Sequence, residues 1–251
     1  MADLKDKLHK QMNKSIQKVT VDKKIGIAFS GGVDSSLLAK ICNDLGYKIT
    51  LLTIGFEDSH DVKHSKETAK MFGYRHKIGK ISQKTFLEIS KEINKTIKTD
   101  NLSWNENCIA FYHVAKLAKH YGITKVLTAN GIDELFCGYN AYREAIKQGK
   151  NSVMKLMKSK LENEINMMKA VNTIASEFGV HIIQPFLYTE FINFSKKIPV
   201  EEKIHGSDDL IRKHIIRDLA LKIGIPHEIS YKRKKAMQYG SLIHKTMMKL
   251  K

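Results

Sequence analysis

A short stretch near the beginning of the chain has the residue types and the spacing of a phosphate-binding turn. It reads Ser-Gly-Gly-Val-Asp-Ser-Ser over residues 30–36. Two adjacent glycines let the backbone turn sharply and approach a ligand, because neither carries a Cβ atom. The unpaired N–H groups of a following helix favour an anion, the serines add hydroxyl donors, and Asp34 adds a carboxylate of the kind that holds Mg²⁺. The pattern predicts a phosphate cradle, although an ordinary strand-to-helix turn contains the same glycine pair.

The residues around this turn predict the strand and the helix that position it. Residues 24–29 are typical of a buried strand, and residues 35–44 of a helix that ends near Gly46. Similar patterns alternate along the chain, with strands expected at 48–56, 75–78 and 125–129 and helices at 64–72, 82–98 and 106–121. Such alternation implies a parallel sheet, and ligands bind beyond the carboxyl ends of its strands. We therefore expect one crevice bordered by residues 30–36, 55–61 and 130–139.

The second part of the chain has a different pattern. Residues 150–177 predict one long helix, and strand patterns are nearly absent apart from residues 181–183. Residues 206–209 read as the start of another helix. We interpret the methionines of the long helix as packing residues: Met154, Met157, Met167 and Met168.

These patterns predict an α/β fold with a doubly wound parallel sheet. We expect an ATP-binding core in residues 1–150, which begins with an amphipathic helix at residues 3–19. A mainly helical part in residues 151–251 would complete the substrate site.

Composition narrows the class of protein. The chain has 251 residues and no run of eighteen apolar residues, and its first residues do not read as a signal peptide, so we expect a soluble, cytoplasmic protein without a membrane partner. Its three cysteines lie far apart with no CxxC, which argues against a disulfide scaffold, a zinc ribbon or an iron–sulfur site. The net charge of +17 raises the chance of a nucleotide or RNA partner. Because the lysines are spread along the chain, nucleic acid is not the favoured partner.

The first motif resembles the pyrophosphate-binding loop (PP-loop) of the ATP pyrophosphatase superfamily. Those enzymes cleave ATP between the α and β phosphates and leave an adenylated substrate. Neither a Walker loop nor a dinucleotide-binding glycine pattern is present.

Three further motifs resemble the synthetase domain of asparagine synthetases, in the same order. Residues 130–139 read NGIDELFCGY and resemble that family's GxGxDELFGGY signature. The PFL segment at 185–187 and the segment from Lys213 to Lys235 resemble its PFLD and KxxLR…LP…RxK motifs. The resemblance covers about residues 4–245. Ser30 lies too close to the start for the family's glutaminase domain, so we expect a stand-alone synthetase domain whose nitrogen is free ammonia or comes from a separate glutaminase subunit.

The resemblance implies ATP and Mg²⁺ as cofactors and a two-step reaction. A small-molecule carboxylate attacks the α-phosphorus, pyrophosphate leaves, and ammonia or an amine attacks the acyl-adenylate. Asp34 and Asp133 are implied to hold Mg²⁺. Lys235 best matches the family's catalytic lysine, with Lys234 and Lys232 as rivals, although a solvated basic turn has the same composition. The expected ATP and pyrophosphate contacts are Ala28, Ser30, Gly31, Gly32, Asp34, Ser35, Ser36, Ile54, Thr128, Ala129 and Gly131.

Some positions depart from the family pattern and leave the substrate open. Asn130 stands where asparagine synthetases usually carry a glutamate that helps the nitrogen nucleophile lose a proton, and an amide cannot act as a base. Tyr188 replaces the aspartate of PFLD, and Cys137 replaces a glycine. We expect an ATP-dependent amide ligase that is asparagine-synthetase-like and homo-oligomeric, with Asn130 among the catalytic residues. The alternatives are an RNA-modifying enzyme that adenylates a base and a non-catalytic nucleotide-binding protein.

Overall fold

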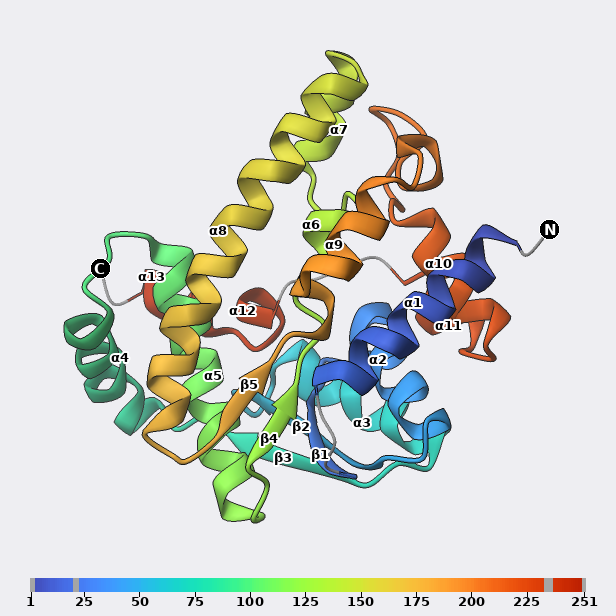
Figure 1. Ribbon diagram of the computed structural model, residues 1–251. Helices are drawn as coiled ribbons and strands as arrows, with labels where there is room; N and C mark the ends of the chain where they lie inside the picture. Colours follow the sequence, from blue (N-terminus) through green and yellow to red (C-terminus); the bar gives the residue numbers. More distant parts are fainter. Residues whose placement is uncertain (1–2, 20–22, 233–236, 250–251) are drawn as a thin grey trace.

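Five strands form one parallel sheet in a computed structural model that describes residues 3–19, 23–232 and 237–249. The sheet order is β3-β2-β1-β4-β5, and every neighbouring pair is parallel (Figure 1). The strands are β1 (Lys24–Ala28), β2 (Lys48–Gly55), β3 (His76–Lys80), β4 (Lys125–Leu127) and β5 (His181–Ile183). The predicted parallel sheet is confirmed.

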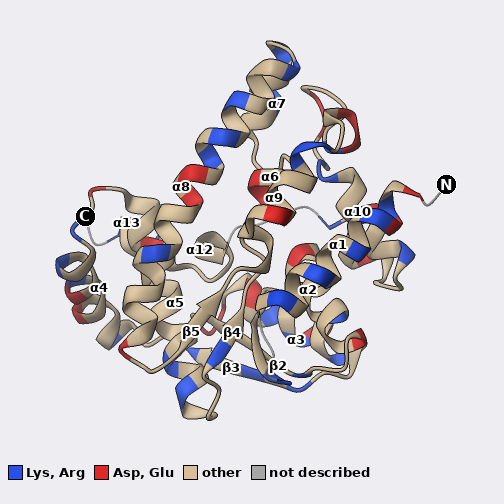
Figure 2. Ribbon diagram, viewed as in Figure 1, with Lys and Arg blue, Asp and Glu red and all other residues tan. Residues whose placement is uncertain are grey.

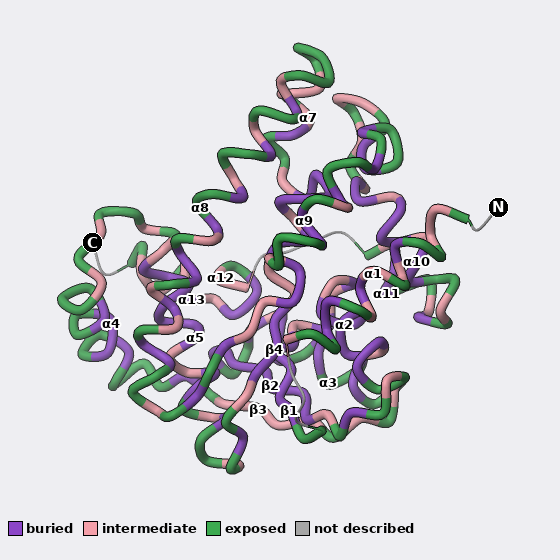
Figure 3. The backbone as a smooth tube through the Cα atoms, in the orientation of Figure 1, coloured by how far each residue is buried: buried purple, intermediate pink, exposed green. Residues whose placement is uncertain are grey.

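Helices cover both faces of this sheet because alternate strand residues point to opposite sides. In β1, Ile25 and Ile27 enter one core and Ala28 enters the other. The first core packs against α1 (Leu4–Val19), α2 (Val33–Asp44), α3 (His60–Phe72), α9 (Thr189–Lys196), α10 (His214–Lys222) and α11 (His227–Ser230). The second packs against α4 (Gln83–Ile97), α5 (Leu102–His120), α8 (Lys150–Ser176) and α13 (Ile243–Met248). The predicted doubly wound α/β fold is therefore confirmed, and Figure 3 shows the mostly buried strands β1 and β2 among helices whose outer sides are exposed.

Shorter elements complete the fold between these layers. They are α6 (Ile132–Leu135), α7 (Ala141–Lys147), α12 (Met237–Gly240) and the 3₁₀ turns η1 (Pro185–Leu187) and η2 (Val200–Glu202).

Two helices begin four residues earlier than their periodicity predicts, because a polar side chain caps each one. The Ser59 hydroxyl accepts the N–H of Val62, so α3 begins at His60 rather than at residue 64. The Asn101 side chain accepts the N–H groups of Ser103 and Trp104, so α5 begins four residues before the predicted start.

The prediction of a helix start at residues 206–209 is wrong. Asp209 instead folds a loop: one carboxylate oxygen accepts the N–H groups of Ile211 and Arg212, each at 2.9 Å, and the other accepts the N–H of His205 at 3.0 Å. Helix α10 begins only at His214. A further prediction fails at Met154, which is 36% exposed and is not a packing residue, whereas Met157, Met167 and Met168 are buried.

The part expected to follow residue 150 shares the sheet with the first part. Strand β5 pairs with β4, and α8 packs along α5. At the other end, α1 packs on α9, α10 and η1, and the Ser15 hydroxyl donates to the Pro185 carbonyl at 2.8 Å. The division at residue 150 stays a prediction. None of the helices in the described ranges combines the length and hydrophobicity that crossing a bilayer requires.

Candidate active site

A pocket lies at the switch point of the sheet, where β1 neighbours β4. The chain leaves β1 toward β2 on one side, whereas β4 joins on the other, so the carboxyl ends of these two strands open into a crevice. The pocket holds about 250 Å³ of free space. Its lining includes Ala28, Ser30, Gly32, Asp34, Ser35, Ile54, Asp61, His64, Asn107, Thr128, Ala129, Asn130, Asp133, Glu134, Tyr139, Lys160, Asn163, Glu164, Lys213, Lys232, Met237 and Gln238.

The turn after β1 is already organised as an anion cradle. The Ser30 hydroxyl accepts the N–H of Gly32 at 3.3 Å and lies 3.4 Å from the Ser35 hydroxyl, which donates to the Gly32 carbonyl. Gly31 has φ +79°, a conformation that glycine adopts readily, and its missing Cβ leaves room for α3. Within the described chain, no side chain caps the N-terminus of α2, so its first N–H groups face the pocket end of the helix.

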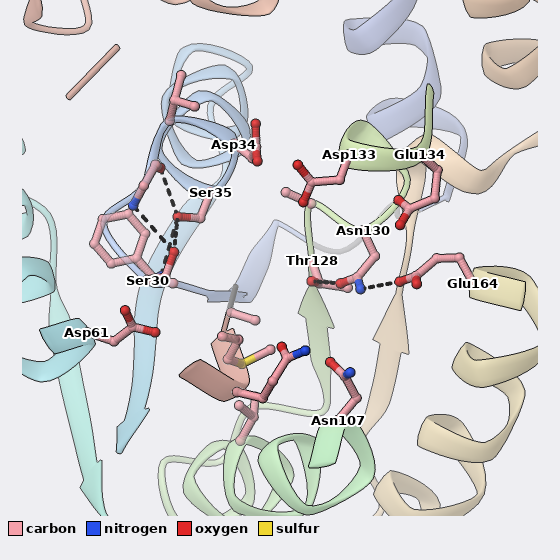
Figure 4. A pocket seen from close by; sticks show the side chains of 18 of the residues that line it. Ser30, Asp34, Ser35, Asp61, Asn107, Thr128, Asn130, Asp133, Glu134 and Glu164 are labelled. Atoms are coloured by element: carbon pink, nitrogen blue, oxygen red, sulfur yellow. Dashed lines mark hydrogen bonds between the residues drawn. The ribbon is translucent and has the colours of Figure 1, made fainter. Parts of the chain in front are cut away.

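Two carboxylates and one ammonium group meet beside this cradle. The Lys213 Nζ lies 2.5 Å from Asp34 Oδ2 and 3.1 Å from Asp133 Oδ1. The lysine side chain is only 1% exposed, and each carboxylate side chain is 18% exposed. Figure 4 shows Asp34, in the first turn of α2, and Asp133, in α6, with their carboxylates pointing toward one another.

The loop before α10 aims Lys213 inward. Arg212 and Lys213 both have positive φ, +52° and +56°, which L residues adopt only when the surroundings impose it. The buried Arg217 side chain holds this loop, since it donates to the carbonyls of Ile211 and Arg212 at 2.9 and 2.7 Å. Gly138 lets the opposite segment approach, because a Cβ there would overlap the carboxylate of Asp133.

The same carboxylates fit a magnesium ion. Asp34 Oδ1 is buried and has no hydrogen-bond partner among the described residues, so one oxygen is available for a further cation. Hard divalent cations prefer carboxylate oxygens. The donor set therefore suits Mg²⁺.

Side chains joined by hydrogen bonds form the wall of the pocket beyond the end of β4. Thr128 donates its hydroxyl to Asn130 Oδ1, and Asn130 Nδ2 donates to Glu164 Oε1 at 2.5 Å (Figure 4). Glu134, next to Asp133, stabilises the backbone: its carboxylate accepts the N–H of Gly131 at 3.1 Å and the hydroxyl of Tyr139. This hydrogen bonding fixes the turn that carries Asn130 and Asp133.

The third side of the pocket joins α3 to the C-terminal segment. The Lys232 ammonium donates to His64 Nδ1 at 2.9 Å, and burial, reinforced by this lysine, lowers the pKa of His64 to about 4. Gly240 packs so closely on Asp61 that a Cβ would overlap the carboxylate. The Phe56 N–H donates to the Ser241 carbonyl at 3.2 Å, so the segment closes over the end of β2.

The family model for asparagine synthase matches residues 7–174 and 156–250, which together span nearly the whole described fold and every wall of this pocket. The chain belongs to the asparagine synthase family.

Relatives within this family are moderately similar in sequence. A protein of Methanocaldococcus jannaschii, whose provisional name is asparagine synthetase (glutamine-hydrolyzing) 1, is 30% identical over 91% of this chain and 48% of its own length. Asparagine synthetase (glutamine-hydrolyzing) 1 of Lotus japonicus is 26% identical over 90% of this chain and 41% of its own. The chain thus spans about half the length of the curated relatives it matches. One solved structure, the NMN synthetase from Francisella tularensis, covers 94% of this chain and 75% of its own at 15% identity, with a TM-score of 0.49.

Most of the asparagine-synthase-like positions predicted from sequence lie in the pocket. Those that line it are Ala28, Ser30, Gly32, Asp34, Ser35, Ile54, Thr128, Ala129, Asn130 and Asp133. Three other predicted positions do not line the pocket but shape the backbone of the turns next to it. Gly31 makes room for α3, Ser36 is buried with its hydroxyl donating to the Gly31 carbonyl, and Gly131 turns the chain at φ +103°.

The predicted catalytic lysines, Lys234 and Lys235, lie outside the described residues, and their role stays a prediction. Their rival Lys232 lies within the described part and lines the pocket. The cysteine that replaces a family glycine, Cys137, is buried and has φ +61°, which explains why a glycine is the usual residue there.

Lys213, Glu164 and His64 line the pocket, and the sequence patterns predicted no functional role for them. Lys213 opens one of the recognised motifs, and that position was a usable signal. Glu164 and His64 lie on helices whose polar face is visible in the sequence, but no local pattern indicates which polar residue of a helix faces the pocket.

Proposed function

We propose that the chain is an ATP-dependent carbon–nitrogen ligase that releases AMP and pyrophosphate. It would activate a small-molecule carboxylate as an acyl-adenylate, which ammonia or an amine then attacks, as in asparagine synthesis. The proposal depends on one observation. The turn after β1, whose N–H and hydroxyl groups suit an anion, lies in the same pocket as Asp34, Asp133 and Lys213, between the ends of β1 and β4.

The cradle suits the cleavage of ATP between its α and β phosphates. Pyrophosphate gains negative charge as it leaves, and preorganised donors aimed at developing charge stabilise such a transition state. The first amides of α2 and the hydroxyls of Ser30 and Ser35 would supply those donors without reorganising, because the turn is already held by its own hydrogen bonds.

Charge at the pocket mouth supports the same step. Lys213 offers an ammonium group next to the phosphate-binding turn and keeps the two aspartates from repelling each other. Asp34 and Asp133 would hold Mg²⁺, which when bound supplies Lewis-acid stabilisation of the phosphates. The closing contacts at Asp61 and Gly240 would limit access of water, which would otherwise hydrolyse an acyl-adenylate.

Pyrophosphate release measured against a panel of amino-acid and other small carboxylates tests this proposal. We expect release that depends on Mg²⁺, on one carboxylate of the panel and on an amine. Asp34→Asn should lower the rate at least about 100-fold, because it removes charge that faces the phosphates. Asp44→Asn, the same change at the exposed end of α2, should leave the rate unchanged. Turnover that forms only ADP would contradict the proposal.

The net charge of +17 motivates a second candidate, an RNA-modifying enzyme that adenylates a base. Figure 2 shows the basic residues spread over α7, α8, α10 and the strands rather than gathered in one stripe, which favours the ligase. Binding of tRNA that weakens steeply with added salt would favour the RNA candidate. ATP binding without any turnover would favour a nucleotide sensor.

A separate glutaminase subunit, a homo-oligomeric state and a cytoplasmic location stay predictions. Copurification and analytical ultracentrifugation of the purified chain address the first two.

A further inference from the structure

Asn130 is held in one orientation, and that orientation presents a carboxylate. The amide oxygen accepts the Thr128 hydroxyl, so the amide nitrogen must face the other way, where it donates to Glu164 Oε1 at 2.5 Å. Glu164 comes from the middle of α8, is 6% exposed and lines the pocket. The buried carboxylate of Glu164 on α8 therefore lies at the end of β4, next to Asn130.

The residue types at the two positions depend on each other. An amide at position 130 can donate a hydrogen bond to the carboxylate of Glu164. A glutamate at position 130 would place a second carboxylate within hydrogen-bond distance of the first, and like charges at that spacing oppose each other strongly. The chain thus lacks the acid at position 130 and holds an acid at position 164, at the same place in the pocket.

The location suits the second half of the proposed reaction. Figure 4 shows the phosphate-binding turn with Ser30 and Ser35 on one side of the pocket and Asn130 with Glu164 on the other. An acyl-adenylate whose phosphate lies at the turn would direct its acyl group toward the opposite wall. A nucleophile that approaches from that wall meets Glu164.

We propose that Glu164, oriented by Asn130, accepts the proton of the amine nucleophile; this assignment rests on the proposed function. The nitrogen lone pair of ammonia or a primary amine attacks the acyl carbon and forms the C–N bond. The nitrogen then carries a positive charge, and Glu164 accepts one proton from it. The bond between the acyl carbon and the phosphate oxygen breaks, and AMP leaves with the electron pair.

Glu164→Gln separates this role from a structural one when the two half-reactions are measured independently. Exchange of labelled pyrophosphate into ATP reports adenylation, and amide formation from ammonium chloride reports the whole reaction. General-base catalysis is worth about 10²–10⁴-fold, so we expect amide formation to fall at least about 100-fold while exchange stays within about threefold of the wild type. Glu162→Gln, the same change at an exposed position of α8, should alter neither rate. Equal loss of both half-reactions, or no loss of either, would overturn the assignment.

A swap variant tests the carboxylate itself and does not depend on the single variant being well folded. Asn130→Glu combined with Glu164→Gln exchanges acid and amide while keeping a donor–acceptor pair between α8 and the end of β4. We expect amide formation to recover to within about tenfold of the wild type, with an unfolding midpoint close to the wild type. A folded swap variant with amide formation as low as in Glu164→Gln would show that the carboxylate at this place is not the proton acceptor.

The failure of the proposed function has a different signature. A wild-type chain that exchanges no pyrophosphate with any carboxylate of the panel would remove the adenylation step, and this assignment with it. Normal exchange together with unaffected amide formation in Glu164→Gln would remove the assignment alone.

Discussion

At the scale of single residues, Lys213 determines the charge of the pocket mouth. Its ammonium group lies between Asp34 and Asp133. These two residues approach each other because α2 and α6 start at the carboxyl ends of the neighbouring strands β1 and β4. The lysine is nearly inaccessible, so solvent cannot replace it easily. A bound magnesium ion and this ammonium group would thus share two carboxylates.

Lys213→Met should make stability depend on magnesium. Removing one partner of a buried ion pair typically costs about 3–5 kcal/mol, because it leaves uncompensated charge. We expect the free energy of unfolding, measured with urea, to fall by about 3 kcal/mol, and MgCl₂ to recover part of the loss.

Lys203→Met is the matched control. Lys203 is also fully buried, but its Nζ donates to the Ser195 carbonyl, and burial lowers its pKa to about 8. Magnesium should not recover the stability of this variant. The same response to MgCl₂ in the wild type and in Lys213→Met would contradict the shared-site argument.

At the scale of elements, two glycines let backbone segments lie directly against pocket carboxylates. Gly138 allows the segment after α6 to pass Asp133, and Gly240 allows α12 to pass Asp61 at the start of α3. Helix α12 and the residue after it close the pocket over the end of β2. This closing segment, residues 237–241, can therefore take its position only because Gly240 has no side chain.

Gly240→Ala should loosen the closing segment without unfolding the protein. The added methyl would overlap the Asp61 carboxylate, and overpacking of this kind costs about 1–3 kcal/mol. Amide hydrogen exchange over residues 237–249 should become faster, and the unfolding midpoint should decrease. Gly206→Ala, where a new Cβ meets only the Asp208 side chain at 3.2 Å, should change neither measurement. Exchange rates equal to the wild type in Gly240→Ala would contradict the close packing.

At the scale of the whole molecule, three histidines that are buried or partly buried make stability depend on pH. Burial is the largest cause that lowers the pKa of His64, His76 and His113 to about 4, against an ordinary value of 6.5. Between pH 6.5 and pH 4 these histidines are protonated in the unfolded chain but remain neutral in the folded chain. The free energy of unfolding should therefore fall as the pH decreases from 6.5 to 4, with a slope of up to about 1.4 kcal/mol per pH unit for each proton.

Urea unfolding at a series of pH values between 7.5 and 4.5 measures that slope. His113→Gln should reduce this slope, because it removes one of the histidines whose pKa burial lowers in the folded chain. His181→Gln, a change at an exposed position, should not reduce it. A free energy of unfolding that stays constant from pH 7 to pH 4.5 would contradict the pKa values of the buried imidazoles.

Local patterns predicted the sheet and the turn between β1 and α2, because both depend on residues that are neighbours in sequence. The buried run of β1, the glycine pair and the first turn of α2 are contiguous. Asp34 and Asp133, which the four ordered motifs indicated, both line the pocket, and their role as magnesium ligands stays a prediction. Two helix starts were placed too late because the capping side chains of Ser59 and Asn101 satisfy N–H groups before the hydrophobic period begins.

Contacts between distant elements could not be predicted in this way. Lys213 reaches Asp34 across 179 residues of sequence, and Glu164 reaches Asn130 across 34. A helical period does not tell which polar residue of α8 enters the pocket. The Asp209 loop has the sequence of a helix start, and its carboxylate accepts the N–H groups two and three residues on as a helix cap would, but the chain stays in a loop until α10 begins at His214.

The packing of α1 on η1 and α9 has a consequence for synthesis of the protein on the ribosome. The apolar stripe of α1, with Leu8, Met12 and Ile16, is fully covered only when segments about 170 residues later are in place. At ordinary translation rates of roughly 5–20 residues per second, this interval lasts about 10 to 30 s. During that time these segments do not yet cover the apolar face of α1, and transiently exposed apolar surface of this kind is what chaperones protect from aggregation.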